Sequence, residues 1–303
     1  MSNELTPMMK QYMQTKEEYK DCILFYRLGD FYEMFFDDAL TASKELEITL
    51  TGKNCGLEER APMCGIPYHA VDSYLNRLVS KGYKVAICEQ VEDPKTAKGI
   101  VKREVIRVVT PGTNLDTQGL DETKNNYIMC IVYLADKYGI SLADVSTGDY
   151  YVTEVDSERK LIDEINKFAP SEIVCNESFY MSGVDLEDMR HRLGITIYSL
   201  DAWYFSDETA ETTLKGHFHV NSLEGLGLND YAYGTIAAGA LLKYLYETQK
   251  NNLDHISAIH PYSTGKFMII DSSTRRNLEL VETMREKQKR GSLLWVLDKT
   301  KTA

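Results

Sequence analysis

Two closely spaced histidines and six cysteines are the first candidates in this sequence for binding a metal. His217 and His219 would project to one side if their segment is a strand, and two imidazoles can begin a metal site. No third ligand with suitable spacing accompanies them, which favours a strand edge that faces solvent. The cysteines form no C-x-x-C pair, and none lies beside a histidine pair in the order that zinc sites use. The sequence therefore predicts free thiols in a reducing compartment and no bound metal.

A nucleotide site is a second kind of chemistry that can be tested by motif. No G-x-x-x-x-G-K-[ST] segment occurs in the 303 residues. The backbone N–H groups and the lysine of such a segment hold the phosphates of a bound nucleotide. We therefore expect this chain to need no cofactor and to hydrolyse no ATP.

An aromatic side chain and a carboxylate two residues apart form a different candidate site. Residues 23–36 are dense in aromatic and aliphatic side chains and are broken at Gly29 and Asp30, which predicts two strands joined by a tight turn. Phe31 and Glu33 would then point to the same side of the second strand. Because several other aromatic residues share this segment, a position in the core is the better interpretation of Phe31 when it is taken alone.

Helices and strands alternate on both sides of this predicted hairpin, which indicates a compact α/β domain. Thr6 before a proline starts one helix, and Asp37 and Asp38 can cap another. Apolar residues at helical spacing predict a helix within residues 71–79.

The second half of the chain repeats the α/β pattern in another order. Residues 111–126 hold few apolar side chains and many turn formers, which is typical of an interdomain linker. Three strands, a helix from Ser157 and a fourth strand at EIVC follow. The apolar run from Tyr231 to Tyr246 predicts a buried helix, because it is shorter than the roughly 20 residues of a membrane span. With no signal or transit peptide at the N-terminus, we expect a cytoplasmic protein.

Charge alone does not suggest a nucleic-acid partner, because the net charge is −12 and phosphate is bound mainly by lysine and arginine. The acidity is concentrated in the second half: 15 basic residues face 18 acidic ones up to residue 120, and 19 face 28 after it. A local basic stretch includes Lys95, Lys98 and Arg107, which we take as candidate phosphate contacts. A solvated face is the commoner meaning of such a stretch.

The segment GDFYEMFFDDA closely resembles the mismatch-probing segment of the MutS family. The likeness extends, in the family's order, to TPMMKQY, PMCGIPYHAV, AICEQVEDP, VTPGT and DSSTRRNLE. The resemblance implies an α/β protein with a mixed-sheet mismatch-recognition domain, an RNase H-like connector domain and the first helices of an all-α core domain. The expected limits are 1–112 for the first domain, 113–126 for a linker, 127–250 for the connector and 251–303 for a truncated start of the core.

For function, the resemblance implies binding of mismatched or unpaired bases in double-stranded DNA during mismatch repair. Phe31 would enter the minor groove, stack on a mispaired base and kink the duplex. A mismatch deforms at lower cost than an intact duplex, so such a sensor reads deformability more than base identity. Glu33 would accept a hydrogen bond from the displaced base, and its charge would be unfavourable wherever no such partner is presented.

The resemblance also places the loop of Gly65, Pro67, Tyr68 and His69 near the DNA backbone and the bent site. Free backbone N–H groups at the start of a helix favour phosphate. A turn made of loop and cap residues is the alternative, and for His69 it is an equally good interpretation.

Two other functions stay open at this stage. The connector could act only as an interaction module, for example with a MutL-type repair partner, without independent mismatch specificity. An RNase H-like nuclease would need at least three acids around two metal ions, and Asp144 with its neighbours forms no obvious cluster. The family's ATPase, with its ATP, Mg²⁺ and most of its dimer contacts, would lie beyond this chain, which we expect to be monomeric.

Overall fold

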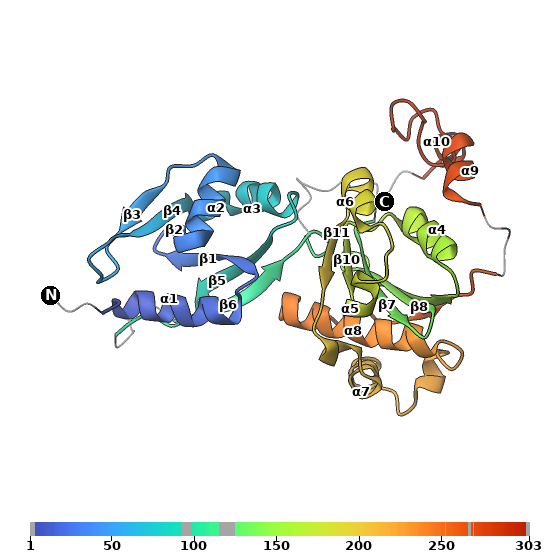
Figure 1. The fold of residues 1–303 in the computed structure, drawn as a ribbon, viewed down its shortest axis with the longest axis horizontal. Coiled ribbons are helices and arrows are strands. Elements are labelled where there is room, and N and C mark those ends of the chain that lie inside the picture. The colour runs from blue at the N-terminus through green and yellow to red at the C-terminus, as the bar shows by residue number, and fades with distance from the viewer. Residues whose placement is uncertain are drawn as a thin grey trace. The chain divides into compact units, whose positions relative to one another are not determined.

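The protein was examined as a computed structural model. The structure describes residues 4–92, 99–114, 125–251, 253–265, 268 and 270–300. The chain forms two compact units, one of residues 1–120 with 244–253 and the other of residues 121–243 with 254–303 (Figure 1).

A mixed six-stranded sheet forms the centre of the first unit, with strand order β3-β4-β2-β1-β5-β6. Only the β1–β5 pair is parallel among its strand pairs in the described residues. The elements are α1 (Pro7–Glu18), β1 (Cys22–Leu28), β2 (Phe31–Phe35), α2 (Phe36–Leu46), β3 (Thr51–Lys53), β4 (Ala61–Pro67), a 3-10 turn η1 (Tyr68–Ala70), α3 (Val71–Val79), β5 (Lys84–Gln90) and β6 (Arg103–Val109).

The predicted hairpin of residues 23–36 and the helix over residues 71–79 are both confirmed. Thr6 caps α1 as predicted, because its side chain accepts a hydrogen bond from the Met9 backbone N–H. The predicted capping of α2 by Asp37 and Asp38 is wrong. That helix begins at Phe36, which places both acids inside its first turn, where they still face the positive end of the helix dipole.

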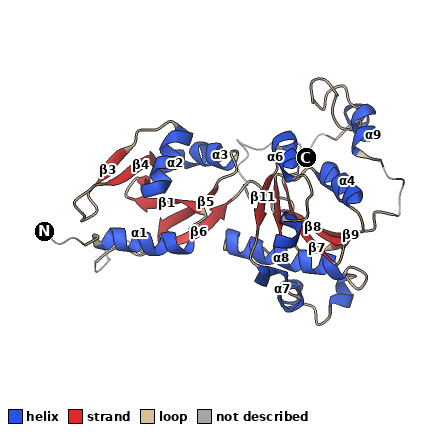
Figure 2. Ribbon diagram, in the orientation of Figure 1, coloured by secondary structure: helices blue, strands red, loops and turns tan. Residues whose placement is uncertain are grey.

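Helices α2 and α3 cover one face of this sheet and α1 covers the other (Figure 2). Side chains of alternate strand residues therefore enter two separate cores. Tyr32 and Met34 of β2 pack with α2 and α3 on one face. Phe35 packs with α1 on the other face. Strand β2 is therefore fixed from both sides, and only its first residues can face solvent.

The second unit has another mixed sheet, with strand order β11-β10-β7-β8-β9-β12. The predicted order of three strands, a helix and a strand is confirmed by its first five elements. The elements are β7 (Tyr127–Leu134), β8 (Lys137–Asp144), β9 (Asp149–Val155), α4 (Glu158–Phe168), β10 (Glu172–Cys175), α5 (Glu177–Tyr180), α6 (Leu186–Leu193), β11 (Thr196–Ser199), η2 (Ala202–Phe205), α7 (Asp207–Phe218), η3 (Leu223–Leu226), α8 (Ala232–Gln249), β12 (His260–Pro261), α9 (Ser272–Asn277) and α10 (Leu293–Leu297). The last residues of α8, from residue 244 on, are counted with the first unit.

Three expectations for the second unit meet different outcomes. The long apolar helix is confirmed as α8, and no helix in the described part of the chain is long and apolar enough to cross a membrane. The strand around His217 is wrong: this residue lies in the last turn of α7, and His219 ends that helix. His217 Nε2 lies 2.7 Å from the carbonyl oxygen of Ile256, so its ring ties α7 to a following segment. The all-α core domain is not established, because the structure describes two short helices after residue 271.

Candidate nucleic-acid interface

Phe31 is a large apolar side chain that the fold leaves in solvent. It is the first residue of β2, directly after the turn at Gly29, whose φ of +58° suits a residue without a side chain. The Phe31 side chain is 47% exposed, whereas its neighbour Tyr32 is 5% exposed. The interpretation of Phe31 as a core residue is therefore wrong.

Glu33 lies on the same side of β2 as Phe31. The proof is the position of Gly65, which pairs with Glu33 across β2 and β4. A Cβ atom built on Gly65 would lie 3.6 Å from Glu33 Cγ and 3.9 Å from Phe31 Cδ1. One small residue thus borders both side chains, and the aromatic ring and the carboxylate form a single surface site.

The Glu33 carboxylate is paired with a lysine from a strand two places away in the sheet. Lys53 Nζ of β3 lies 2.5 Å from Glu33 Oε2. The side chains of Lys53 and Glu33 are 33% and 16% exposed. Sequence reasoning missed Lys53, because 20 residues separate it from Glu33 and no periodic pattern predicts the order of the strands.

The loop after β4 lies beside Phe31, although the two are far apart in the sequence. Pro67 pairs with Phe31 in the ladder between β2 and β4, and the Tyr68 backbone N–H donates to the Asp30 carbonyl oxygen at 2.9 Å. The side chains of Tyr68 and His69 are both exposed, with their ring centroids 5.9 Å apart. The structure therefore places Gly65 beside Glu33 and Phe31, and Pro67 beside Phe31. Tyr68 is bonded to Asp30, and the His69 side chain is exposed.

Arg27 connects the Gly29 turn to this loop. Its Nε donates to the Gly29 carbonyl oxygen at 2.6 Å, and its Cζ lies 3.9 Å from the centre of the Tyr68 ring. Glu89 accepts hydrogen bonds from both Arg27 and the Tyr32 hydroxyl. Burial, together with Glu89, raises the pKa of Tyr32, so this hydroxyl stays a neutral donor. Sequence reasoning missed Arg27, whose only signal was its place beside the turn.

Comparison with known protein families identifies both units. A family model described as MutS domain I matches residues 6–118, and one described as MutS domain II matches residues 126–257. The chain belongs to the MutS family. It is 69% identical over 300 residues to the DNA mismatch repair protein MutS of Lachnoclostridium phytofermentans, covering 99% of this chain and 32% of that protein.

Further MutS relatives show the same partial coverage. The DNA mismatch repair proteins MutS of Ruminiclostridium cellulolyticum and Acetivibrio thermocellus are each 54% identical over 302 residues, covering 99% of this chain and 34% of the relative. The chain therefore spans about a third of the length of the curated MutS relatives that it matches.

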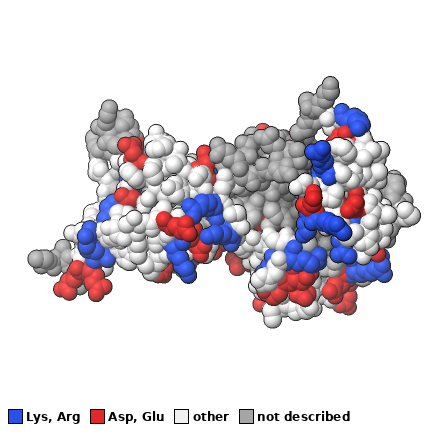
Figure 3. Space-filling model, turned by 90° about the horizontal axis from the view of Figure 1, so that it is seen from above, with Lys and Arg blue, Asp and Glu red and all other residues white. Residues whose placement is uncertain are grey.

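One candidate phosphate contact in the basic stretch of MutS domain I is engaged within the unit itself. Lys95 and Lys98 lie outside the described residues. Arg107 is half-buried, its Nη2 donates to the Thr113 carbonyl oxygen at 2.6 Å, and burial lowers its pKa. On the face that Figure 3 shows, lysine and arginine side chains lie beside aspartate and glutamate side chains rather than in a field of one sign. The candidate phosphate contacts thus stay a prediction.

Asp144 of MutS domain II is a buried turn residue. Its Oδ1 accepts hydrogen bonds from the backbone N–H and hydroxyl of Ser146 at 2.8 and 2.6 Å, and its Oδ2 accepts the Asn126 backbone N–H at 3.0 Å. In the described parts of the chain, no three His, Cys, Asp or Glu side chains are grouped to hold a metal ion. The described residues therefore contain no carboxylate cluster of the kind that a two-metal nuclease needs.

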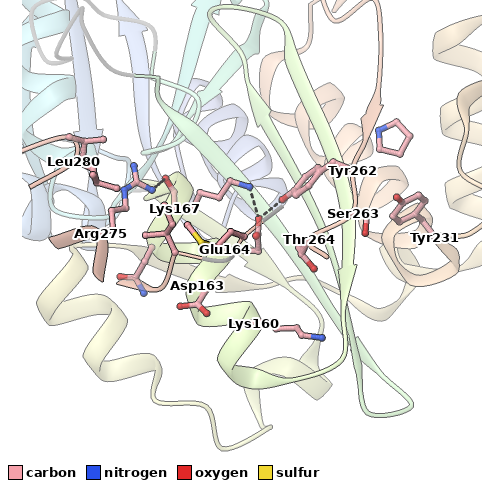
Figure 4. Close-up of a pocket in the computed structure, with 15 residues that line it drawn as sticks. Lys160, Asp163, Glu164, Lys167, Tyr231, Tyr262, Ser263, Thr264, Arg275 and Leu280 are labelled. Atoms are coloured by element: carbon pink, nitrogen blue, oxygen red, sulfur yellow. Dashed lines mark hydrogen bonds and ion pairs between the residues drawn. The ribbon is translucent and has the colours of Figure 1, made fainter. Parts of the chain in front are cut away.

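A hollow of about 770 Å³ lies in the second unit between α4, residues 261–264 and a later segment that contributes Met268, Ile270, Arg275, Leu280 and Val281. Figure 4 shows that its polar groups face one another: Glu164 Oε2 accepts the Tyr262 hydroxyl at 2.5 Å and lies 3.3 Å from Lys167 Nζ. Burial and the Glu164 charge raise the pKa of Tyr262. These groups stabilise the wall of the hollow, and none of the residues predicted to be functional lies in it.

Proposed function

We propose that this chain recognises mismatched or unpaired bases in double-stranded DNA as part of a DNA mismatch repair protein. Phe31 enters the minor groove and stacks on the mispaired base, the duplex kinks, and Glu33 accepts a hydrogen bond from that base. The observation that carries the proposal is an exposed phenyl ring beside a carboxylate, at the start of a strand in MutS domain I. The names of the relatives, DNA mismatch repair protein MutS, point to the same process.

The geometry suits a wedge for physical reasons. A phenyl ring that is 47% exposed gains contact area only when something covers it, and stacking on a base contributes about 1–3 kcal/mol. The ring is carried by a strand that is packed on both faces, so binding need not bear the entropic cost of ordering that strand. A mismatched step is already weakly stacked and is separated by the ring at lower cost than a matched one.

Other parts of the proposal rest on the membership of the MutS family. Gly65, Pro67, Tyr68 and His69 would approach the backbone near the bent site, and Lys95, Lys98 and Arg107 would contact phosphates. The domain limits would be 1–112, 113–126, 127–250 and 251–303, with the RNase H-like connector offering a surface for a MutL-type partner. ATP hydrolysis would belong to parts of the relatives that this chain does not span, so the chain would act as a binding module.

The test is fluorescence-anisotropy binding to a G·T duplex and a matched duplex at low salt. The wild-type chain should prefer the mismatch, and Phe31→Ala should lose that preference. Leu40→Ala is the matched control, because Leu40 of α2 is also 47% exposed and removing it leaves the probe surface intact. A wild-type chain that binds both duplexes equally would instead support the alternative of a partner-interaction module without mismatch specificity.

A further inference from the structure

Lys53 reaches Glu33 across a strand that lies between them. In the sheet β4 separates β3 from β2, and at the position opposite Glu33 it carries Gly65, which has no side chain. Lys53 Nζ is 2.5 Å from Glu33 Oε2 and 5.6 Å from the centre of the Phe35 ring. The lysine is thus fixed against the same face of the sheet that carries the probe residues.

The ion pair divides the roles of the two carboxylate oxygens. Oε2 of Glu33 is occupied by Lys53, whereas Oε1 accepts no hydrogen bond from any residue that the structure describes. A carboxylate can accept hydrogen bonds on both oxygens. Glu33 is therefore held by one oxygen and keeps the other for a donor from outside the protein.

We infer that Lys53 is a positioning residue for the probe carboxylate, fixing Glu33 Oε2 so that Oε1 can accept one N–H of a displaced base. This inference rests on the proposed function. It also assigns Lys53 an electrostatic role, because a carboxylate without a counter-charge repels the phosphates of any duplex. Lys53 lowers that repulsion whether or not a mismatch is present.

Removing Lys53 should affect the two kinds of duplex unequally. On a matched duplex no base reaches Glu33, so the carboxylate has Lys53 as its partner. On a mismatched duplex the displaced base donates a hydrogen bond to the carboxylate and compensates part of its charge. Loss of Lys53 therefore weakens matched binding more than mismatched binding. A lysine that merely touched a phosphate would weaken both equally.

The test compares Lys53→Met, Glu33→Gln, the double variant and Lys53→Arg in the 303-residue chain, on matched and G·T duplexes, by anisotropy. Lys53→Met should weaken matched binding about fivefold, the effect of roughly 1 kcal/mol, and mismatched binding about twofold. In the Glu33→Gln background the same substitution should weaken both duplexes equally, by less than about twofold. Lys53→Arg should restore wild-type behaviour, and circular dichroism should show that every variant folds.

Equal losses on both duplexes, unchanged when Glu33 is replaced, would overturn the role of Lys53 and make it an ordinary phosphate contact. Failure of the proposed function would look different. In that case Phe31→Ala would leave the ratio of mismatched to matched binding at its wild-type value, and the inference about Lys53 would be overturned with it.

Discussion

A buried aspartate connects α1 and α2 to strand β1, the neighbour of β2, and its removal should lower the free energy of unfolding substantially. Asp38 of α2 is 7% exposed and accepts three contacts: Lys16 Nζ at 2.9 Å, the Leu24 backbone N–H at 3.0 Å and the Tyr12 hydroxyl at 3.3 Å. These partners belong to α1 and β1. Asp38→Ala would remove this acceptor from all three groups, leaving the Tyr12 hydroxyl and Lys16 Nζ with backbone carbonyl oxygens alone and the Leu24 N–H without its side-chain partner.

The magnitude follows from the burial of these partners. Breaking a buried ion pair by removing one member costs about 3–5 kcal/mol. The Lys16 side chain keeps 21% exposure and can regain water, so the lower end applies and we expect a loss of roughly 3 kcal/mol. Asp37→Ala is the matched control in the same helical turn, because Asp37 is exposed and should contribute about 0.5 kcal/mol through the helix dipole.

Hydrogen exchange read by mass spectrometry on peptides of β5 measures this loss in the first unit alone. Strand β5 pairs with β1, and among the described residues none of its groups is hydrogen-bonded to Asp38, so its amides report unfolding of the unit. Exchange should speed up on the order of 100-fold in Asp38→Ala and about twofold in Asp37→Ala. Equal exchange in the two variants would refute the role of the buried aspartate.

Three further predictions concern the loop after β4, the glycine that lies beside Phe31 and Glu33, and the buried thiols. Arg27→Ala should weaken binding of both duplexes in the anisotropy assay, because it frees Tyr68 from the Gly29 turn. Gly65→Ala should change the unfolding free energy by less than about 1 kcal/mol, since its Cβ would meet ordinary contact distances, while the methyl group beside Phe31 reduces mismatch preference about fivefold. Burial raises the thiol pKa of Cys22, Cys64 and Cys88 to about 12, so these thiols lose their protons in the unfolded state before they do so in the folded state. The free energy of unfolding should therefore fall as pH rises from about 9 towards 12. Iodoacetamide should label the same three thiols slowly in the folded chain at pH 8.

Local elements could be predicted from the sequence because local patterns determine them. The break at Gly29 predicted the hairpin, and helical spacing predicted α3. The pairing of Phe31 with Pro67 and of Lys53 with Glu33 depends on strand order, which periodicity does not contain. The exposure of Phe31 depended on the same information, because whether the first residue of a strand is covered can be seen only when the sheet and its helices are assembled.

His217 shows a different limit of sequence reasoning. Two histidines two residues apart suggest a strand only if the backbone is extended, and the helical segment before them was not recognised. In a helix, residues two apart point in different directions, so the two imidazoles do not face a common site. The observed contact of His217 with Ile256 joins segments 39 residues apart, a distance along the chain that no local motif spans.

The single parallel pair among the described strands of the first sheet has a consequence for how the protein reaches its native state. Cys22 of β1 pairs with Lys84 of β5, so one edge of the β1–β2 hairpin stays unpaired until a segment 62 residues later in the chain has been added. The hairpin itself closes through neighbours in sequence, on a timescale of about 1–10 μs, whereas pairing across so long a loop is slower. During synthesis at roughly 5–20 residues per second, β1 emerges several seconds before β5 can cover it. Pulse-labelling hydrogen exchange should therefore find the β1–β2 amides protected before those of β5, and the newly made hairpin presents an open strand edge in that interval.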